Sequence, residues 1–293
     1  MRHAVLGGGG IGGLIAGALS RSGAEVVLVL RPESVARYDG SLRVESVVLG
    51  DFDVEVPAAS DLERGVDVLW VATKATQLES ALALAPSAVV GDAVVVPLLN
   101  GVDHVELLRA RYRNVVAAAI LVESERVRPG LISQKSPFLR IDLAGAEPVR
   151  AALAAAGIDC RPREDEATLL WEKLVTLAPI ALATTAFDAP LGGVRDRPVF
   201  AGCRAEASAA AEADGAEVEV ESVRRLHAAA PSDLQSSMQK DVAAGREPEL
   251  VAIAGPIVRS GQEHGFSTDS TSFLVDQIRA RLRRAPSGAG PGR

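Results

Sequence analysis

The sequence predicts an α/β protein with an N-terminal Rossmann-type dinucleotide-binding domain followed by an all-helical C-terminal domain. In the first half, short apolar runs rich in β-branched residues alternate with helical patterns, as a parallel sheet with crossover helices requires. The glycine-rich segment LGGGGIGG joins the first run to a helical pattern, and after about residue 165 the segments are rich in Ala, Leu and Glu at helical spacing. We therefore expect domains over residues 1–165 and 166–285, and a disordered tail over residues 286–293.

The composition is typical of a globular protein that acts on small molecules. The chain has 293 residues, which exceeds the length of one typical domain, and 48% of these residues are hydrophobic. A formal net charge of -7 with scattered basic residues argues against a sequence-independent nucleic-acid binder, which needs a concentrated basic face. Cys160 and Cys203 provide neither a disulfide framework nor a metal-ligand spacing, and the four histidines form no ligand pair, so we expect no metal.

The N-terminal apolar stretch is interrupted by glycines and lacks the order of regions found in a signal peptide. Every longer apolar run is broken by Gly, Pro or charge before the roughly 18 residues that a membrane span needs. We expect a cytoplasmic protein with no membrane partner.

The first three elements are a strand over residues 3–6, a helix over residues 11–22 and a strand over residues 25–30. Continuous β-branched runs of this kind indicate strands that are covered on both faces. The same pattern predicts further buried strands over residues 67–72, 93–98 and 115–122, with helices near residues 76–84 and 102–111.

Two hairpins are expected beside this alternation. Residues 41–56 alternate between apolar and polar around Gly50-Asp51, and a second hairpin is predicted over residues 131–143. In the second half the helical spacing covers residues 166–186, 198–215, 218–230 and 249–264.

The glycine-rich turn carries the strongest local signal. In a GxGxxG pattern the glycines permit a tight turn, close approach of a pyrophosphate to the backbone, and close packing of helix on strand. Two registers fit, one starting at Gly7 and one starting at Gly8, and we prefer the first because it follows the strand directly. A merely flexible loop is the alternative, although it does not account for the surrounding strand and helix order. The predicted cofactor contacts in this turn are Gly7, Gly9, Gly10, Ile11 and Gly12.

The residue after the second strand indicates which dinucleotide is bound. An NAD site usually places Asp or Glu about 20 residues beyond the glycines, where it binds the ribose 2′-hydroxyl. Here that position is Arg31, and a guanidinium binds a 2′-phosphate where a carboxylate repels it. The sequence therefore predicts NADP(H), with a solvated surface arginine before Pro32 as the alternative.

In the order and spacing of several motifs, the chain resembles the ketopantoate reductase (2-dehydropantoate 2-reductase) family over nearly its whole length. The resemblance implies a Rossmann domain and a helical domain with the active site in the cleft between them. It also implies NADPH-dependent reduction of 2-oxopantoate to (R)-pantoate, on the route to pantothenate and coenzyme A. The motifs are LGGGGIGG (6–13), Arg31, VATKATQ (71–77), LLNGV (98–102), WEKLV (171–175) and SSMQKDVAAGREPEL (236–250).

Lys74 and Asn100 follow predicted strands, at the edge where open α/β sheets place their ligand crevice. The resemblance assigns both to the cofactor, and Asn100 also to the substrate. A surface lysine and an ordinary turn asparagine are the alternatives.

Lys173 interrupts a strongly apolar helical segment, and a positioned ammonium there can stabilise and protonate the oxygen of a carbonyl that accepts a hydride. The resemblance makes Lys173 the general acid and substrate contact. It makes Glu249 a catalytic carboxylate that binds the substrate hydroxyl, and it places Ser237 near the substrate carboxylate, with Asp241 as a weaker candidate. Alternatively, Lys173 marks a solvated helix face, and Ser237 and Asp241 have cap or surface roles.

The chain departs from the family where amides normally bind the polar substrate. The positions usually occupied by asparagine are Leu177, Ala181 and Ala254. A site built around hydroxyl contacts discriminates strongly when those contacts are missing. The alternatives to ketopantoate reduction are therefore a related enzyme that reduces a more apolar 2-oxo acid or carbonyl, and a non-catalytic dinucleotide-binding module. The expected partner is a small 2-oxo acid, and the expected state is a monomer or homodimer.

Overall fold

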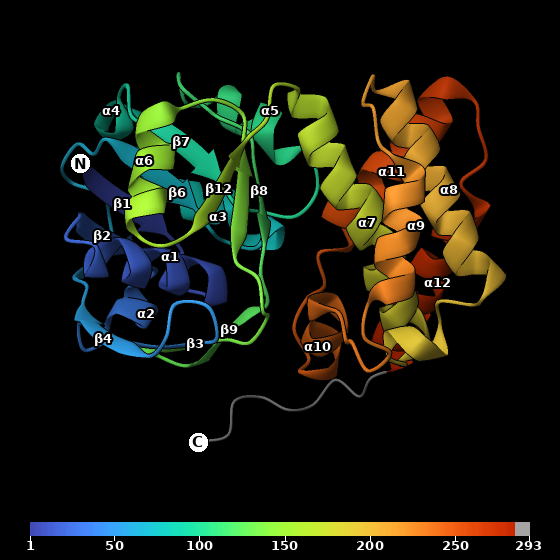
Figure 1. Ribbon diagram of the computed structural model, residues 1–293, viewed down its shortest axis with the longest axis horizontal. Helices are drawn as coiled ribbons and strands as arrows, with labels where there is room; N and C mark the ends of the chain where they lie inside the picture. Colours follow the sequence, from blue (N-terminus) through green and yellow to red (C-terminus); the bar gives the residue numbers. More distant parts are fainter. Residues whose placement is uncertain (285–293) are drawn as a thin grey trace. The chain divides into compact units, whose positions relative to one another are not determined.

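The computed structural model describes residues 1–284 and divides the chain into two compact units, residues 1–170 and the part that begins at Trp171 (Figure 1). Helix α7 (Glu166–Phe187) contributes its first turn to the first unit. The tail predicted over residues 286–293 lies outside the described residues.

The first unit is built on a parallel five-stranded sheet. Its order is β5-β2-β1-β6-β7, so the first strand lies in the middle, as the Rossmann prediction requires. Four of the predicted strands are thereby confirmed in this sheet. The strands are β1 (Arg2–Leu6), β2 (Glu25–Val29), β5 (Ala58–Ala59), β6 (Val68–Val71) and β7 (Val94–Pro97).

Both faces of this sheet are buried, which explains its unbroken apolar runs. On one face Val5 and Trp70 pack with helix α1 (Gly10–Arg21) in one core cluster. On the other face Leu6 and Leu69 belong to a second cluster, which includes side chains from the connecting helices. These helices are α3 (Leu78–Leu82), α4 (Ser87–Val90) and α5 (His104–Arg109), and the 3-10 turn η1 (Ala75–Gln77) precedes α3.

Helix α1 lies between the parallel sheet and a second sheet, which contacts it through all four of its strands (Figure 1). The order of this second sheet is β4-β3-β10-β9. The predicted hairpin over residues 41–56 is confirmed, because β3 and β4 pair antiparallel. The four strands are β3 (Ser41–Ser46), β4 (Phe52–Glu55), β9 (Ser124–Arg128) and β10 (Leu131–Gln134).

The hairpin predicted over residues 131–143 is wrong. Strand β10 instead pairs antiparallel with β9 across the turn at Pro129-Gly130, where Gly130 has a φ of +77°. The side chain of Gln134 accepts a hydrogen bond from the Ser46 hydroxyl at 2.7 Å and fixes the end of β10 to β3. The other half of the prediction, β11 (Arg140–Leu143), joins a three-stranded sheet with β8 (Ala118–Leu121) and β12 (Asp159–Pro162).

The strand predicted over residues 115–122 is divided between two sheets. Val115 forms an isolated parallel bridge with Val95 of β7, whereas β8 pairs with β11. Several elements of the first unit carried no sequence prediction, namely the single turn α2 (Pro32–Val35), helix α6 (Glu147–Ala155), the short helix α4 and strands β5, β9 and β12.

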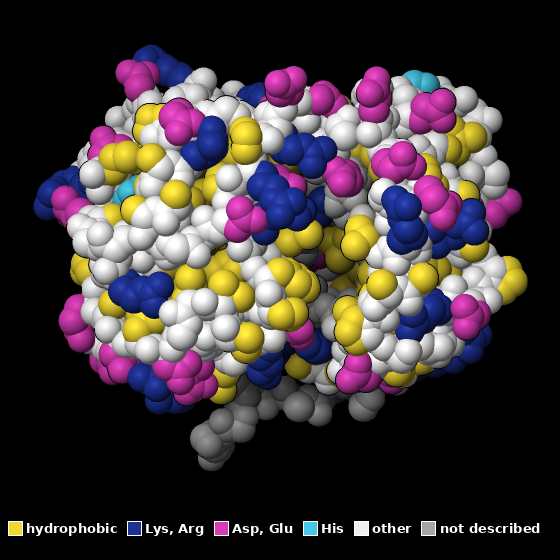
Figure 2. Space-filling model, in the orientation of Figure 1, with side chains coloured by type: hydrophobic (Ala, Val, Ile, Leu, Met, Phe, Trp, Pro, Cys, Tyr) yellow, Lys and Arg dark blue, Asp and Glu magenta, His cyan; other side chains and the backbone are white. Residues whose placement is uncertain are grey.

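The second unit is helical, as predicted. Helix α7 is long and apolar enough to cross a membrane by length and composition, but 61% of that stretch is buried inside the structure, as in the core helix of a soluble protein. Helix α8 packs on α11 and α12, and the carboxylate of Glu206 accepts hydrogen bonds from the amides of Ser270 and Thr271 at 2.7 Å. On the face shown in Figure 2, acidic and basic side chains are interspersed. The remaining helices are α8 (Pro198–Ala213), α9 (Val220–Ala229), α10 (Ser237–Ala243), α11 (Leu250–His264) and α12 (Asp269–Arg284).

Candidate functional site

The register of the parallel sheet brings four segments to one edge. Leu6 at the end of β1 lies opposite Val29 of β2 and Val71 of β6, and Val71 lies opposite Pro97 of β7. Segments that follow these strands therefore leave the sheet together, at the edge where parallel α/β sheets bind ligands. The predicted cofactor residues Gly7, Arg31, Lys74 and Asn100 all lie in these segments.

The geometry of the turn supports the register that begins at Gly7. Gly7 follows β1 directly with a φ of +102°, a backbone conformation that favours glycine. A Cβ at Gly12 would overlap the carbonyl oxygen of Gly7, whereas a Cβ at Gly9 would meet nothing within 4 Å. Gly12 thus permits the close approach of α1 to the residue that follows β1, and Gly9 faces open space beside the turn.

Helix α1 begins beside this open space with its amide groups uncapped by side chains. Its N-cap is Gly9, which makes no side-chain hydrogen bond, and its first turn contains no acidic residue. The first amides of a helix lack intrahelical partners and carry a partial positive charge, so such a terminus binds phosphate groups. The pyrophosphate of a dinucleotide fits these features.

Gly10 and Ile11 have packing roles in the structure. A Cβ at Gly10 would overlap the backbone of Ser124, because strand β9 passes close to the start of α1. Ile11 is half-buried against the core between the two sheets. Their predicted cofactor contacts, made through the backbone, remain predictions.

Strand β9 is the part of this site that sequence reasoning missed. The hydroxyl of Ser124 donates to the carbonyl oxygen of Gly10 at 3.0 Å, and the guanidinium of Arg126 donates to that of Gly8 at 3.3 Å. The Pro129-Gly130 pair was the available signal, because such a pair marks a turn and implies a strand before it.

The polar residues at the sheet edge differ in exposure. Arg31 is exposed, and its Nε lies 3.2 Å from a carboxylate oxygen of Glu33. Lys74 and Asn100 are half-buried, with Lys74 directly before η1 and Asn100 directly before Gly101, whose φ is +89°. The structure places all three on the edge that carries the glycine turn.

In the second unit, Lys173 and Glu249 form an electrostatic pair. Lys173 is half-buried on α7 beside Trp171 and Leu174, which are buried, and Glu249 is only 8% exposed at the N-cap of α11. Burial lowers the pKa of Lys173 to about 8, and the negative charge of Glu249 acts in the opposite direction. An amine with this pKa exchanges protons near neutral pH, as a general acid must.

Ser237 and Asp241 lie on α10 in different surroundings. The N-cap role belongs to Ser236, whose hydroxyl accepts a hydrogen bond from the amide of Gln239 at 3.1 Å, while Ser237 is exposed. Asp241 is buried, and its carboxylate lies 2.8 Å from the Nε of Arg246. Asp241 thus connects α10 to the loop that leads to α11.

Asp241→Asn is expected to lower the stability of the helical unit by about 1–2 kcal/mol, because it weakens a charge-assisted hydrogen bond of a buried group. The matched control is Asp276→Asn, since Asp276 is 75% exposed and lies 3.9 Å from Arg279 in a pair that contributes little. Differential scanning calorimetry of both variants measures the effect. Equal melting temperatures for the two variants would show that the contact of Asp241 with Arg246 is not stabilising.

The three departures from the expected amides all lie in the helical unit. Leu177 follows Lys173 by one helical turn on α7 and is half-buried, while Ala181 and Ala254 are 1% and 3% exposed. No side-chain amide is available at these positions, so they offer apolar contacts only.

The first unit thus has the sheet order, glycine turn and uncapped helix terminus of a dinucleotide-binding domain, and the second carries a buried carboxylate beside a lysine. Together they define a two-domain nicotinamide-dependent oxidoreductase. The family described as ketopantoate reductase PanE/ApbA matches residues 3–144, and its C-terminal domain matches residues 167–282. The chain belongs to the ketopantoate reductase family.

Individual relatives agree with this assignment. A 2-dehydropantoate 2-reductase of Mycobacterium tuberculosis (strain CDC 1551 / Oshkosh) is 30% identical over 99% of this chain and 98% of its own length. A PanE/ApbA family ketopantoate reductase from Ralstonia eutropha JMP134 is 27% identical, with a TM-score of 0.87 over 97% of this chain and 99% of that chain. D-mandelate dehydrogenase with NADH and anilino(oxo)acetate shares the fold, with a TM-score of 0.84 over 97% and 99% of the two chains, at 22% identity.

Proposed function

We propose that the protein reduces 2-dehydropantoate (ketopantoate) to (R)-pantoate with NADPH. The observation that carries the proposal is Lys173, a half-buried amine with a pKa lowered to about 8 beside Glu249, in a chain of the ketopantoate reductase family. The nearly full-length relative named 2-dehydropantoate 2-reductase supports the choice of substrate.

The glycine turn fits a dinucleotide. The open space at Gly9 and the uncapped amides of α1 suit a pyrophosphate, and Lys74 and Asn100 lie on the same sheet edge as candidate cofactor contacts. NADP(H), rather than NAD(H), is proposed because Arg31 follows β2 where an NAD site carries a carboxylate.

When bound, the nicotinamide supplies a hydride to the carbonyl carbon of the substrate. Charge then develops on the carbonyl oxygen, and the ammonium of Lys173 stabilises it and donates the proton that completes the alcohol. We propose that Glu249 keeps this ammonium charged and accepts a hydrogen bond from the substrate hydroxyl. We assign Ser237 to the substrate carboxylate and Asn100 to both substrate and cofactor.

The decisive experiment follows the oxidation of NADPH with ketopantoate and with a panel of branched and aromatic 2-oxo acids, using NADH as the cofactor control. Turnover with ketopantoate is expected, together with a preference for NADPH. Binding of NADPH without turnover of any carbonyl would instead identify a non-catalytic dinucleotide-binding module and overturn the proposal.

The second candidate function is reduction of a more apolar 2-oxo acid. Leu177, Ala181 and Ala254 favour it, because they leave no side-chain amide to bind a distal hydroxyl of the substrate. Turnover of phenyl- or alkyl-substituted 2-oxo acids with no turnover of ketopantoate would select this function.

The pH profile tests the role of Lys173. A general acid must be protonated to act. The value of kcat/KM for carbonyl reduction is therefore expected to be constant below pH 8 and to fall as the pH rises through about 8. The reverse oxidation needs the neutral amine and is expected to rise through the same pH. In Lys173→Arg, the fall of kcat/KM is expected to move above the measurable pH range. A fall that stays at about pH 8 in this variant would show that another group is responsible for it.

We further propose that the protein acts in the cytoplasm as a monomer or homodimer, without nucleic-acid or membrane partners. Sedimentation of the purified protein measures the oligomeric state.

A further inference from the structure

A small hollow lies beside the glycine turn, at the carboxyl end of β2. Its wall includes the backbone of Gly8, the side chain of Leu30 just after β2, and Ser34 of the turn α2. Arg37 and Arg126 reach it from the segment after α2 and from β9. In dinucleotide-binding folds this end of the second strand receives the ribose that carries the adenine.

The hollow is positively charged. Within residues 1–284 its lining contains two guanidinium groups and the hydroxyl groups of Ser34 and Tyr38 but no carboxylate, and the other lining residues are glycines, a proline and aliphatic residues. Each of these groups is a hydrogen-bond donor, and two arginines suit a dianionic phosphate.

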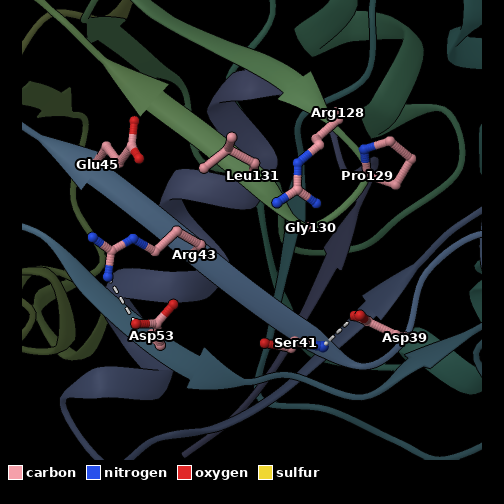
Figure 3. A pocket seen from close by; sticks show the side chains of 9 residues that line it. All are labelled: Asp39, Ser41, Arg43, Glu45, Asp53, Arg128, Pro129, Gly130 and Leu131. Carbon is pink, nitrogen blue, oxygen red and sulfur yellow. Dashed lines mark hydrogen bonds and ion pairs between the residues drawn. The ribbon is translucent and has the colours of Figure 1, made fainter.

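A neighbouring hollow shares Pro129 and Gly130 with the first but has a different character (Figure 3). There Arg43 lies 2.8 Å from Asp53, and Arg128 faces a lining that also contains Asp39 and Glu45. These carboxylates repel a phosphate. Arg126 and Arg128 belong to the same strand but line different hollows. The hollow at Arg126 suits an anion, whereas the hollow at Arg128 does not.

The guanidinium of Arg126 is already positioned next to the turn. One of its nitrogens donates to the carbonyl oxygen of Gly8 at 3.3 Å, and a guanidinium has five N–H donors, so the remaining donors are available to a ligand. Arg31 differs, because its Nε lies 3.2 Å from the carboxylate of Glu33, which weakens its field toward an anion.

We propose that Arg126 and Arg37, with the hydroxyl of Ser34, bind the 2′-phosphate of NADPH and determine the preference for NADPH over NADH together with Arg31. This inference rests on the proposed use of NADPH. It adds strand β9 to the cofactor site as the source of a specificity-determining residue.

The test measures cofactor binding by calorimetry without substrate, so it is independent of turnover. Arg126→Ala is expected to raise the Kd of NADPH roughly ten- to hundredfold and to leave the Kd of NADH nearly unchanged. Arg37→Ala is expected to act in the same direction. Competition by 2′,5′-ADP is expected to weaken in both variants, whereas competition by 5′-AMP, which lacks the 2′-phosphate, is expected to stay constant.

Arg128→Ala is the matched control, because it removes the same charge from the same strand but from the other hollow. It is expected to change neither Kd by more than about twofold, as for an exposed charge. Wild-type protein that prefers NADPH while Arg126→Ala keeps that preference would overturn this inference and leave the proposed function intact. Wild-type protein that binds both cofactors equally would overturn the assignment of NADPH as well. Equal losses of NADPH affinity in Arg126→Ala and Arg128→Ala would show that only the net charge matters and would overturn the specific role of Arg126.

Discussion

Replacing Lys173 by methionine is expected to lower kcat for carbonyl reduction about 10²- to 10⁴-fold, the usual contribution of a positioned general acid. Methionine keeps an unbranched chain but removes the ammonium, so the developing charge on the carbonyl oxygen loses both its stabilising cation and its proton source. Steady-state oxidation of NADPH measures the loss, and calorimetry is expected to show an unchanged Kd for NADPH.

Lys135→Met is the control, because Lys135 is an exposed lysine of the first unit that pairs with Glu125. It is expected to leave kcat unchanged. A Lys173→Met enzyme that keeps more than about a tenth of the wild-type kcat would contradict a general-acid role and would favour the solvated-face alternative.

The second large effect is expected at the glycine turn. Gly12→Ala places a Cβ against the carbonyl oxygen of Gly7, so the turn must distort. Such overpacking costs about 1–3 kcal/mol, which corresponds to a roughly ten- to hundredfold rise in the Kd of NADPH if the strain falls on the bound state. Calorimetry measures the affinity, and thermal unfolding without cofactor reports the strain in the free protein.

Gly9→Ala separates packing from ligand approach. A Cβ at Gly9 meets nothing within 4 Å, so the melting temperature of the free protein is expected to stay near the wild-type value. The affinity for NADPH is nevertheless expected to fall, because the added methyl group occupies the space proposed for the pyrophosphate. Unchanged affinity in this variant would move the pyrophosphate away from Gly9.

The sequence predicts the parallel sheet well because strands that are buried on both faces have continuous apolar runs in the sequence. Strands β2, β6 and β7 consist mainly of apolar residues and β1 ends in Ala-Val-Leu, and the residues that follow these strands meet at one edge by register alone. The positions of Gly7, Lys74 and Asn100 therefore follow from the sequence without knowledge of tertiary contacts.

The other elements depend on long-range contacts that the pattern of apolar and polar residues does not encode. Strands β10 and β11 have similar patterns but belong to different sheets, and long-range partners such as Ser46 for Gln134 decide between them. Helix α12 ends in an arginine-rich stretch with little apolar signal, and its N-terminus is held by Glu206 of α8. The position of Arg126 beside the glycine turn is not predictable from the sequence for the same reason, because its hydrogen-bond partner Gly8 is distant in sequence.

The closeness of β9 to the start of α1 also bears on how the chain reaches its native state during synthesis. Ser124 donates to the carbonyl oxygen of Gly10 across 114 residues, and Ser46 donates to Gln134 across 88 residues. Contacts of such high sequence separation form slowly, and nascent domains fold as units once their partners are available. The glycine turn lies among the first residues to be synthesised, whereas its neighbour β9 is synthesised much later. We therefore expect the nascent chain to expose the flank of α1 that β9 covers until that strand has left the ribosome.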